Sequence, residues 1–197
     1  MISSYRLGDL VMVTLNNNEE NELKTDFPDS IGAEYILKRK QLRNDIDTII
    51  DIVKERIKKY ENLFPADIEN STVIHLRLGD VVSGNEIHEK QKRPLDIEYY
   101  KNIIDPTQKI YVIGKCFFAK PSSKNYDECI QKSKSYQESI LKTFNAELFD
   151  SNSADIDLCF AVKSKLFIQG KGYYSALITE IRKKLNLKTI ETSITNY

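Results

Sequence analysis

The chain has 197 residues, of which 41% are hydrophobic and 29% are charged, as in an ordinary globular protein with one sizeable core. Lysine and arginine together number 29, equal to the acidic residues, so the net charge is zero and the basic excess typical of a duplex-binding protein is missing. No apolar run approaches the roughly 18 residues of a membrane span, and no leader segment opens the sequence, so we expect a cytoplasmic protein with no membrane span and no nucleic-acid partner.

The three cysteines, Cys116, Cys129 and Cys159, are an odd number and show no CxxC spacing. This pattern excludes a disulfide framework and a cysteine zinc site. His75 and His88 are the only histidines of the sequence, too few for a histidine-rich metal cluster. We therefore expect reduced thiols and no metal or other cofactor.

Residues 1–69 predict a short N-terminal segment made of one strand, one polar loop and one long helix. Residues 10–15 are rich in strand-forming residues, and residues 16–30 are polar and end in a Pro-Asp-Ser turn. From residue 33 to residue 64 hydrophobic residues recur every three or four positions, which indicates a helix with one buried face. That face consists of Leu42, Ile46, Ile49, Val53, Ile57, Tyr60 and Phe64.

Residues 70–197 alternate short apolar runs with helical patterns and predict a second, nucleotide-sugar-binding domain. The expected strands are residues 72–76, 109–114, 147–149 and 166–168. The expected helices are one that begins near Asp96, and residues 126–144, 154–163 and 174–185. Short buried strands separated by helices are typical of an α/β fold with a doubly wound, mostly parallel sheet of the Rossmann-like kind.

Ligands of such sheets bind beyond the carboxyl ends of the strands, and the first strand leads into HLRLGD at residues 75–80. In extended backbone His75 and Arg77 share one face, and the Arg77 guanidinium matches two phosphate oxygens of a diphosphate. Asp80 is placed to pair with Arg77, to fix the loop or to accept a proton. The alternative is a plain strand end with a structural Arg77–Asp80 pair and a solvated His75.

A second candidate is the sequence QGKGYYS at residues 169–175, which follows the strand expected at residues 166–168. Two glycines between a strand and a helix can present free N–H groups to an anion. Lys171 adds a charge and Ser175 adds a hydroxyl. The segment matches neither the Walker loop nor GxGxxG, and a plain turn between strand and helix is the alternative.

The tripeptide Asp-Ile-Asp occurs at residues 45–47 and again at residues 155–157. In one large class of glycosyltransferases, paired aspartates of this form bind a metal and a sugar nucleotide. The first copy lies within the predicted long helix, on a solvated face. The second copy lies at a predicted helix start, where carboxylates complement exposed N–H groups, so we expect no metal there.

HLRLGD resembles the His-x-Arg-Arg-x-Asp signature of the fucosyltransferase superfamily that contains the α1,2-, α1,6- and protein O-fucosyltransferases. KIYVIGKCFF from residue 109 resembles the family's next strand, and DSNSADIDLCFAVKSKLFIQGKGYYSALI from residue 150 is similar to its last block. YRLGD at residues 5–9 is similar to a turn near the start of the family's acceptor domain. The resemblance covers residues 70–187, which implies the donor-binding half of a two-domain GT-B fold.

The resemblance implies a donor, GDP-fucose or another nucleoside diphosphate sugar, and a set of residues that bind it. Arg77 would contact the diphosphate, and His75 would help to place the nucleotide or the phosphate. Asp155 or Asp157 would lie where the family reads the base and the ribose. The complete implied set is His75, Arg77, Asp155, Asp157, Gly172 and Ser175.

The implied activity is transfer of fucose, or a related sugar, to a glycan or protein acceptor without a metal. Negative charge develops on the departing diphosphate, and Arg77 and the N–H groups of the glycine turn would stabilise it. Asp80 and His88 are the candidates for the base that activates the acceptor. Leu78 stands in place of the family's second arginine, and Lys115 in place of an aspartate after the second strand.

Two other functions are open at this point. A non-catalytic domain that binds a nucleotide or a sugar phosphate would keep the anion site without an acceptor pocket, and the short N-terminal segment favours it. A structural interaction protein would instead use the helix at residues 33–64 to pair with a partner. The sequence leaves the oligomeric state open.

Overall fold

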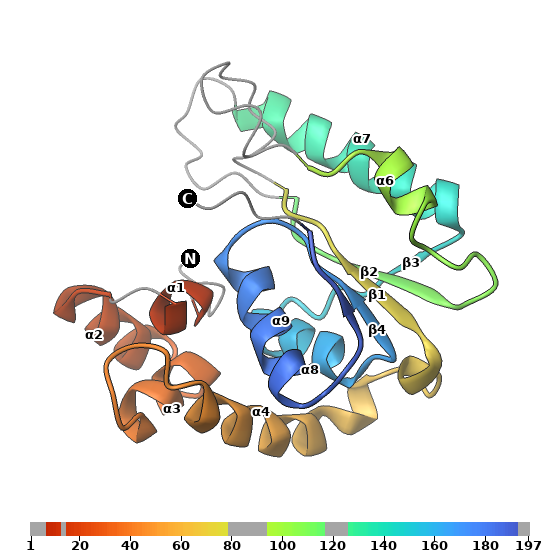
Figure 1. Ribbon diagram of the computed structural model, residues 1–197. Helices are drawn as coiled ribbons and strands as arrows, with labels where there is room; N and C mark the ends of the chain where they lie inside the picture. The colour runs from red at the N-terminus through yellow and green to blue at the C-terminus, as the bar shows by residue number, and fades with distance from the viewer. Residues whose placement is uncertain (1–6, 13–14, 79–93, 117–125, 193–197) are drawn as a thin grey trace.

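The computed structural model describes residues 7–12, 15–78, 94–116 and 126–192 (Figure 1). Five parallel strands form one sheet in the order β3-β2-β1-β4-β5. The strands are β1 (Thr72–His75), β2 (Ile110–Ile113), β3 (Glu147–Leu148), β4 (Leu166–Ile168) and β5 (Thr189–Ile190). This arrangement confirms the predicted α/β fold with a doubly wound, Rossmann-like parallel sheet.

Helices cover both faces of the sheet, which explains why its central strands contain few polar residues (Figure 1). On one face, α6 (Ile97–Lys101) and α7 (Tyr126–Phe144) enclose a core that contains Ile74 of β1. On the other face, α8 (Ala154–Lys163) and α9 (Tyr173–Lys184) enclose a core that contains Val73. In the described part of the chain no helix is both long and apolar enough to cross a membrane.

The described part of the N-terminal segment is helical, and the strand expected at residues 10–15 is wrong. Leu10 and Val11 belong to the helix α1 (Leu7–Met12), and both are fully buried in the core beside α9. Strand propensity is a weak preference that packing overrides, and here an apolar helix face buries these side chains. Most of the expected polar loop is also a helix, α2 (Asn17–Asp26), which a capping box between Asn16 and Glu19 starts.

The long helix expected at residues 33–64 is two helices, α3 (Ile31–Lys38) and α4 (Ile46–Tyr60), followed by the 3-10 turns η2 (Glu61–Leu63) and η3 (Ile68–Asn70). Asp45 makes the break, because its carboxylate accepts the backbone N–H groups of Lys40 and Thr48 and so caps the start of α4. Asp45 is therefore buried and not on a solvated face as expected.

The predicted apolar face of the second helix is largely confirmed. Ile49 and Val53 are fully buried where α4 packs against α8, whereas Leu42 precedes α4 and is 64% exposed. Because the chain buries this face in its own core, the face is not available to a partner helix. The structural interaction protein considered above loses the surface on which it depended.

Arg182 of α9 is a fully buried cation that caps a neighbouring helix. Its Nη1 donates to the carbonyls of Ala161, Val162 and Ser164 at the end of α8, at 2.7–2.9 Å. Its Nη2 donates to the Lys188 carbonyl just before β5. Burial lowers the pKa of Arg182 to about 10. Among the described residues no carboxylate pairs with Arg182, so the dipoles of these carbonyls stabilise its charge.

We expect Gly8→Ala to destabilise the protein by about 1–3 kcal/mol, because a Cβ at Gly8 would lie 2.5 Å from the Tyr173 carbonyl oxygen and the Tyr174 nitrogen. Gly32→Ala is the matched control, since its Cβ would meet nothing closer than 3.7 Å and alanine favours a helix. Urea unfolding followed by circular dichroism measures both changes. An equal effect of the two substitutions would contradict the close approach of α1 to α9.

Arg182→Leu should lower the free energy of unfolding by about 3–5 kcal/mol, because several buried carbonyls lose their donor together. The control Lys184→Ala removes a neighbouring charge that is 54% exposed, and should change stability by less than about 0.5 kcal/mol. The same unfolding measurement applies. A small loss for Arg182→Leu would mean that water replaces the guanidinium without difficulty.

Candidate functional site

The candidate site lies where β1 and β4 run side by side and the direction of chain progression through the sheet reverses. Parallel pairing sets Ile74 of β1 opposite Ile168 of β4. The two loops that follow these strands therefore leave the same edge of the sheet next to each other. In open α/β sheets this switch point is the usual place for a ligand.

Two glycines of the loop after β4 pack directly on the end of β1. A Cβ at Gly170 would lie 2.6 Å from the His75 Nδ1 and would also collide with the His75 carbonyl oxygen. A Cβ at Gly172, whose φ is +96°, would overlap the Arg77 Nη1 and lie 3.3 Å from the guanidinium carbon. The loop can approach the strand this closely only because both positions lack a side chain.

Positive charge gathers where this loop enters α9. The helix begins at Tyr173, and its N-cap residue Gly172 offers no side-chain hydrogen bond to the first turn. Arg77 lies against Gly172, so a guanidinium adjoins the positive end of the helix dipole. Lys171 makes no ion pair or hydrogen bond within the described residues, and partial burial lowers its pKa. This combination favours a bound anion.

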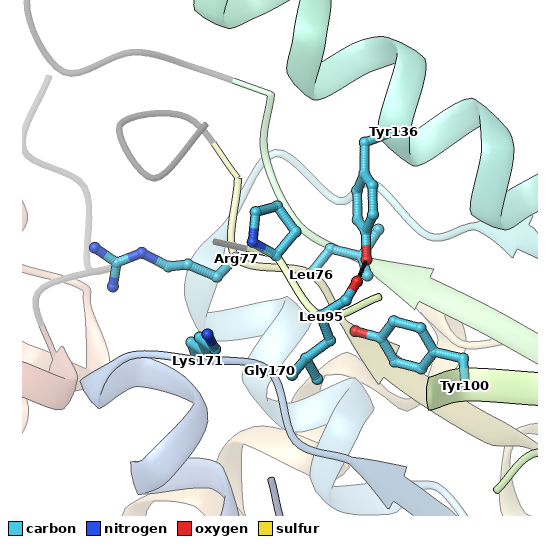
Figure 2. Close-up of a pocket in the computed structure, with 8 residues that line it drawn as sticks. Leu76, Arg77, Leu95, Tyr100, Tyr136, Gly170 and Lys171 are labelled. Atoms are coloured by element: carbon cyan, nitrogen blue, oxygen red, sulfur yellow. Dashed lines mark hydrogen bonds between the residues drawn. The ribbon is translucent and has the colours of Figure 1, made fainter. Parts of the chain in front are cut away.

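A small pocket lies beside these cations on the α6–α7 face of the sheet, and its empty space of about 180 Å³ includes open solvent. Figure 2 shows Arg77 and Lys171 on one side of it and two tyrosines on the other. Tyr136 donates its hydroxyl hydrogen to the Leu95 carbonyl, which fixes the segment before α6 on α7. The complete lining is Leu76, Arg77, Pro94, Leu95, Tyr100, Tyr136, Gly170 and Lys171.

His75 is a buried, neutral part of the loop support. Its side chain is 92% buried beside the Tyr174 ring, with the two ring centroids 5.4 Å apart. Burial, and secondarily the Arg77 charge, lowers the pKa of His75 to about 3. Its Nδ1 has no hydrogen-bond partner among the described residues and faces the Gly170 backbone. At neutral pH His75 therefore shapes the site without contributing charge.

Ser175 closes the glycine loop on the helix. Its Oγ is fully buried and accepts the Gly170 N–H at 2.8 Å. This bond fixes the turn that brings Gly170 to His75. Ser175 thus lies in the candidate site, and its hydroxyl oxygen is engaged by the protein backbone.

Asp155 and Asp157 are buried in the first turn of α8. Asp155 accepts the backbone N–H of Ile31 at 2.8 Å and so links α8 to the start of α3. Asp157 accepts the Ser151 hydroxyl at 2.5 Å, and burial raises its pKa. The two residues are 5% and 6% exposed, and both carboxylates lie close enough to Tyr174, whose ring packs beside His75, to raise its pKa.

The structure thus brings together His75, Arg77, Gly172 and Ser175 from the expected set. Asp80 and His88, the candidates for the base, lie outside the described residues. Sequence reasoning missed Tyr100 and Tyr136, which line the pocket. Pro94 followed by Asp96 correctly indicated the start of α6. The spacing of these two residues carries no information on which part of the sheet the helix would cover.

Among the described residues, no three His, Cys, Asp or Glu side chains converge on a position that could hold a metal ion. Comparison of the chain with protein-family models, with curated proteins and with solved structures finds no match. The fold and the site geometry are therefore the observations on which a function can be argued.

We expect His75 to make the protein less stable as the pH falls. A histidine whose pKa is 6.5 when unfolded and about 3 when folded takes up a proton first in the unfolded state. Its contribution is therefore complete above pH 6.5 and is lost progressively towards pH 3. Between pH 7 and pH 5 the free energy of unfolding should fall by about 2 kcal/mol from this group.

His75→Gln removes the ionisable group and should flatten this dependence, whereas Tyr174→Phe keeps the imidazole and should retain it. Urea unfolding at pH 7, 6 and 5 measures the slope for each protein. A slope that is unchanged in His75→Gln would show that the imidazole is not buried in its neutral form.

Proposed function

We propose that the chain binds a nucleoside diphosphate sugar at the carboxyl edge of β1 and β4 and transfers the sugar to a glycan or protein acceptor. The observation that carries this proposal is the Arg77 guanidinium lying on Gly172 at the start of α9. Fucose, or a related sugar, and GDP as the nucleotide follow from the sequence resemblance and are part of the proposal.

The diphosphate is assigned to the start of α9 because three kinds of donor meet there. The first-turn N–H groups of the helix carry a partial positive charge, and Arg77 adds a forked, permanently charged donor. Lys171 adds an ammonium that is partly withdrawn from water and has no other partner among the described residues. A diphosphate satisfies all three, since it carries several oxygens and more than one negative charge.

The reaction needs charge stabilisation more than it needs covalent help from the protein. The bond between the anomeric carbon and the diphosphate oxygen breaks, and its electron pair leaves with the diphosphate. An acceptor hydroxyl oxygen forms the new bond to the anomeric carbon and loses its proton to a base. Arg77 and the N–H groups of α9 would stabilise the departing diphosphate, and Asp80 and His88 are the candidate bases.

A non-catalytic domain that binds a nucleotide or sugar phosphate is the second candidate. The described residues beside Arg77 and Lys171 enclose almost no space, so they show an anion-binding edge without a formed acceptor pocket. A small anion held at the start of α9 needs no such pocket. The phosphate contacts would be the same in both candidates.

Arg77→Ala should weaken the binding of pyrophosphate and GDP by at least about tenfold, because a charge-assisted contact to phosphate is lost. Isothermal titration calorimetry measures the affinities, and unchanged far-UV circular dichroism shows that the fold is retained. Lys163→Ala is the matched control, because it removes one positive charge from a side chain that pairs with Glu61 and Glu69, remote from the site. Equal affinities for the native protein and Arg77→Ala would reject the assignment.

Labelled GDP-fucose then separates the two candidates. Release or transfer of the labelled sugar that Arg77→Ala abolishes supports the enzyme. Saturable binding with no release, in the presence of glycan and protein acceptors, supports the non-catalytic domain.

A further inference from the structure

We infer that Tyr173 is a stacking platform for the base of a nucleoside diphosphate whose phosphates occupy the start of α9. The inference rests on the proposed function and adds to it a residue that selects nucleotides over other anions. Neither the resemblance nor the comparisons assign any role to Tyr173.

Tyr173 begins α9 and is exposed to solvent. It is the first residue of α9 and directly follows Gly172, on which the Arg77 guanidinium lies. Consecutive Cα atoms are about 3.8 Å apart, so the Cα atom of Tyr173 lies close to Gly172, where the phosphates are proposed to bind. The side chain is 43% exposed, which leaves much of this large apolar ring without protein cover.

The neighbouring tyrosine shows what a structural ring looks like at this place. Tyr174 turns inward, packs beside His75 and donates its hydroxyl hydrogen to the Ala154 carbonyl at 2.5 Å. The Tyr173 hydroxyl has no hydrogen-bond partner within the described residues. Of these two adjacent tyrosines, Tyr174 packs within the protein and Tyr173 is exposed at the start of α9.

The backbone of Tyr173 is held from two directions, so the ring is presented from a rigid base. The α1 helix packs on it through Gly8, whose Cβ would lie 2.5 Å from the Tyr173 carbonyl oxygen. On the other side, Ser175 ties the turn through the Gly170 N–H. A tyrosine on such a base has only two side-chain torsions to order, so little entropy is lost when a flat ligand covers it.

The chemistry of the ligand favours an aromatic ring at this position. Every nucleobase presents a flat π-face, whichever base it is. Stacking of that face on an aromatic side chain adds substantially to the binding affinity. Phosphate contacts alone do not distinguish a nucleotide from pyrophosphate. A ring beside the phosphates supplies that distinction.

The test compares pyrophosphate, GDP and fucose 1-phosphate by calorimetry on the native protein, Tyr173→Ala and Tyr173→Phe. We expect Tyr173→Ala to weaken the binding of GDP by about tenfold and to leave the affinities for pyrophosphate and fucose 1-phosphate unchanged. Tyr173→Phe keeps the π-face and should bind all three ligands as the native protein does. Tyr173→Leu, which keeps apolar volume without a π-face, serves as a second variant and should behave like Tyr173→Ala.

Three results would overturn the inference in distinguishable ways. Equal weakening of GDP and pyrophosphate would mean that Tyr173 shapes the phosphate site, and weakening of fucose 1-phosphate alone would mean that the ring holds the sugar. Unchanged GDP binding in Tyr173→Ala would mean that the base lies elsewhere. If the native protein binds neither pyrophosphate nor GDP, the proposed function itself fails, and the inference with it.

Discussion

The parallel pairing of β1 with β4 is the constraint on which the carboxyl edge of this sheet depends. It sets the end of β1 beside the loop that enters α9, two segments almost a hundred residues apart in the chain. Gly170 and Gly172 then allow the backbone of this loop to approach the end of β1 so closely that His75 and Arg77 touch it. Without this pairing the charges near α9 would be separate surface residues.

Most of the polar side chains near this edge serve the fold. Asp155 and Ser175 each accept a backbone N–H from another segment, and His75 is buried in its neutral form. Such groups must be satisfied or neutral, because an unpaired charge in the core is expensive. Arg77 and Lys171 differ from them, because they place positive charge beside the start of α9. Polarity near the site is therefore a poor guide to function unless the partners of each group are known.

The sequence predicted the sheet well, and it predicted the N-terminal segment badly. Helices at residues 126–144 and 154–163 have the expected bounds because their apolar periodicity and flanking turns agree. Residues 10–15 failed, because a strand-like run of six residues reads the same as the buried face of a short helix. β5 was missed since two residues carry no periodicity.

The site itself was predictable only in part. Local spacing sufficed to indicate the strand end at Arg77 and the glycine turn at Gly172. The acceptor role of Asp155 was beyond such reasoning, since its partner Ile31 lies 124 residues away along the chain. The tyrosine wall of the pocket depends on how α6 and α7 pack, and no short-range pattern encodes that packing.

Arg182 holds the C-terminal end of α9, and other contacts hold its N-terminal end. Its guanidinium fastens the last turn of the helix to carbonyls at the end of α8, remote from the glycine loop that precedes the first turn. The first turn is held separately, where α1 packs on the Tyr173 backbone and the Gly170 N–H bonds to Ser175. Because both ends of α9 are fixed, an exchange of the loop between β4 and α9 that replaced Gly170 or Gly172 would disturb the edge of the sheet and not only a surface turn.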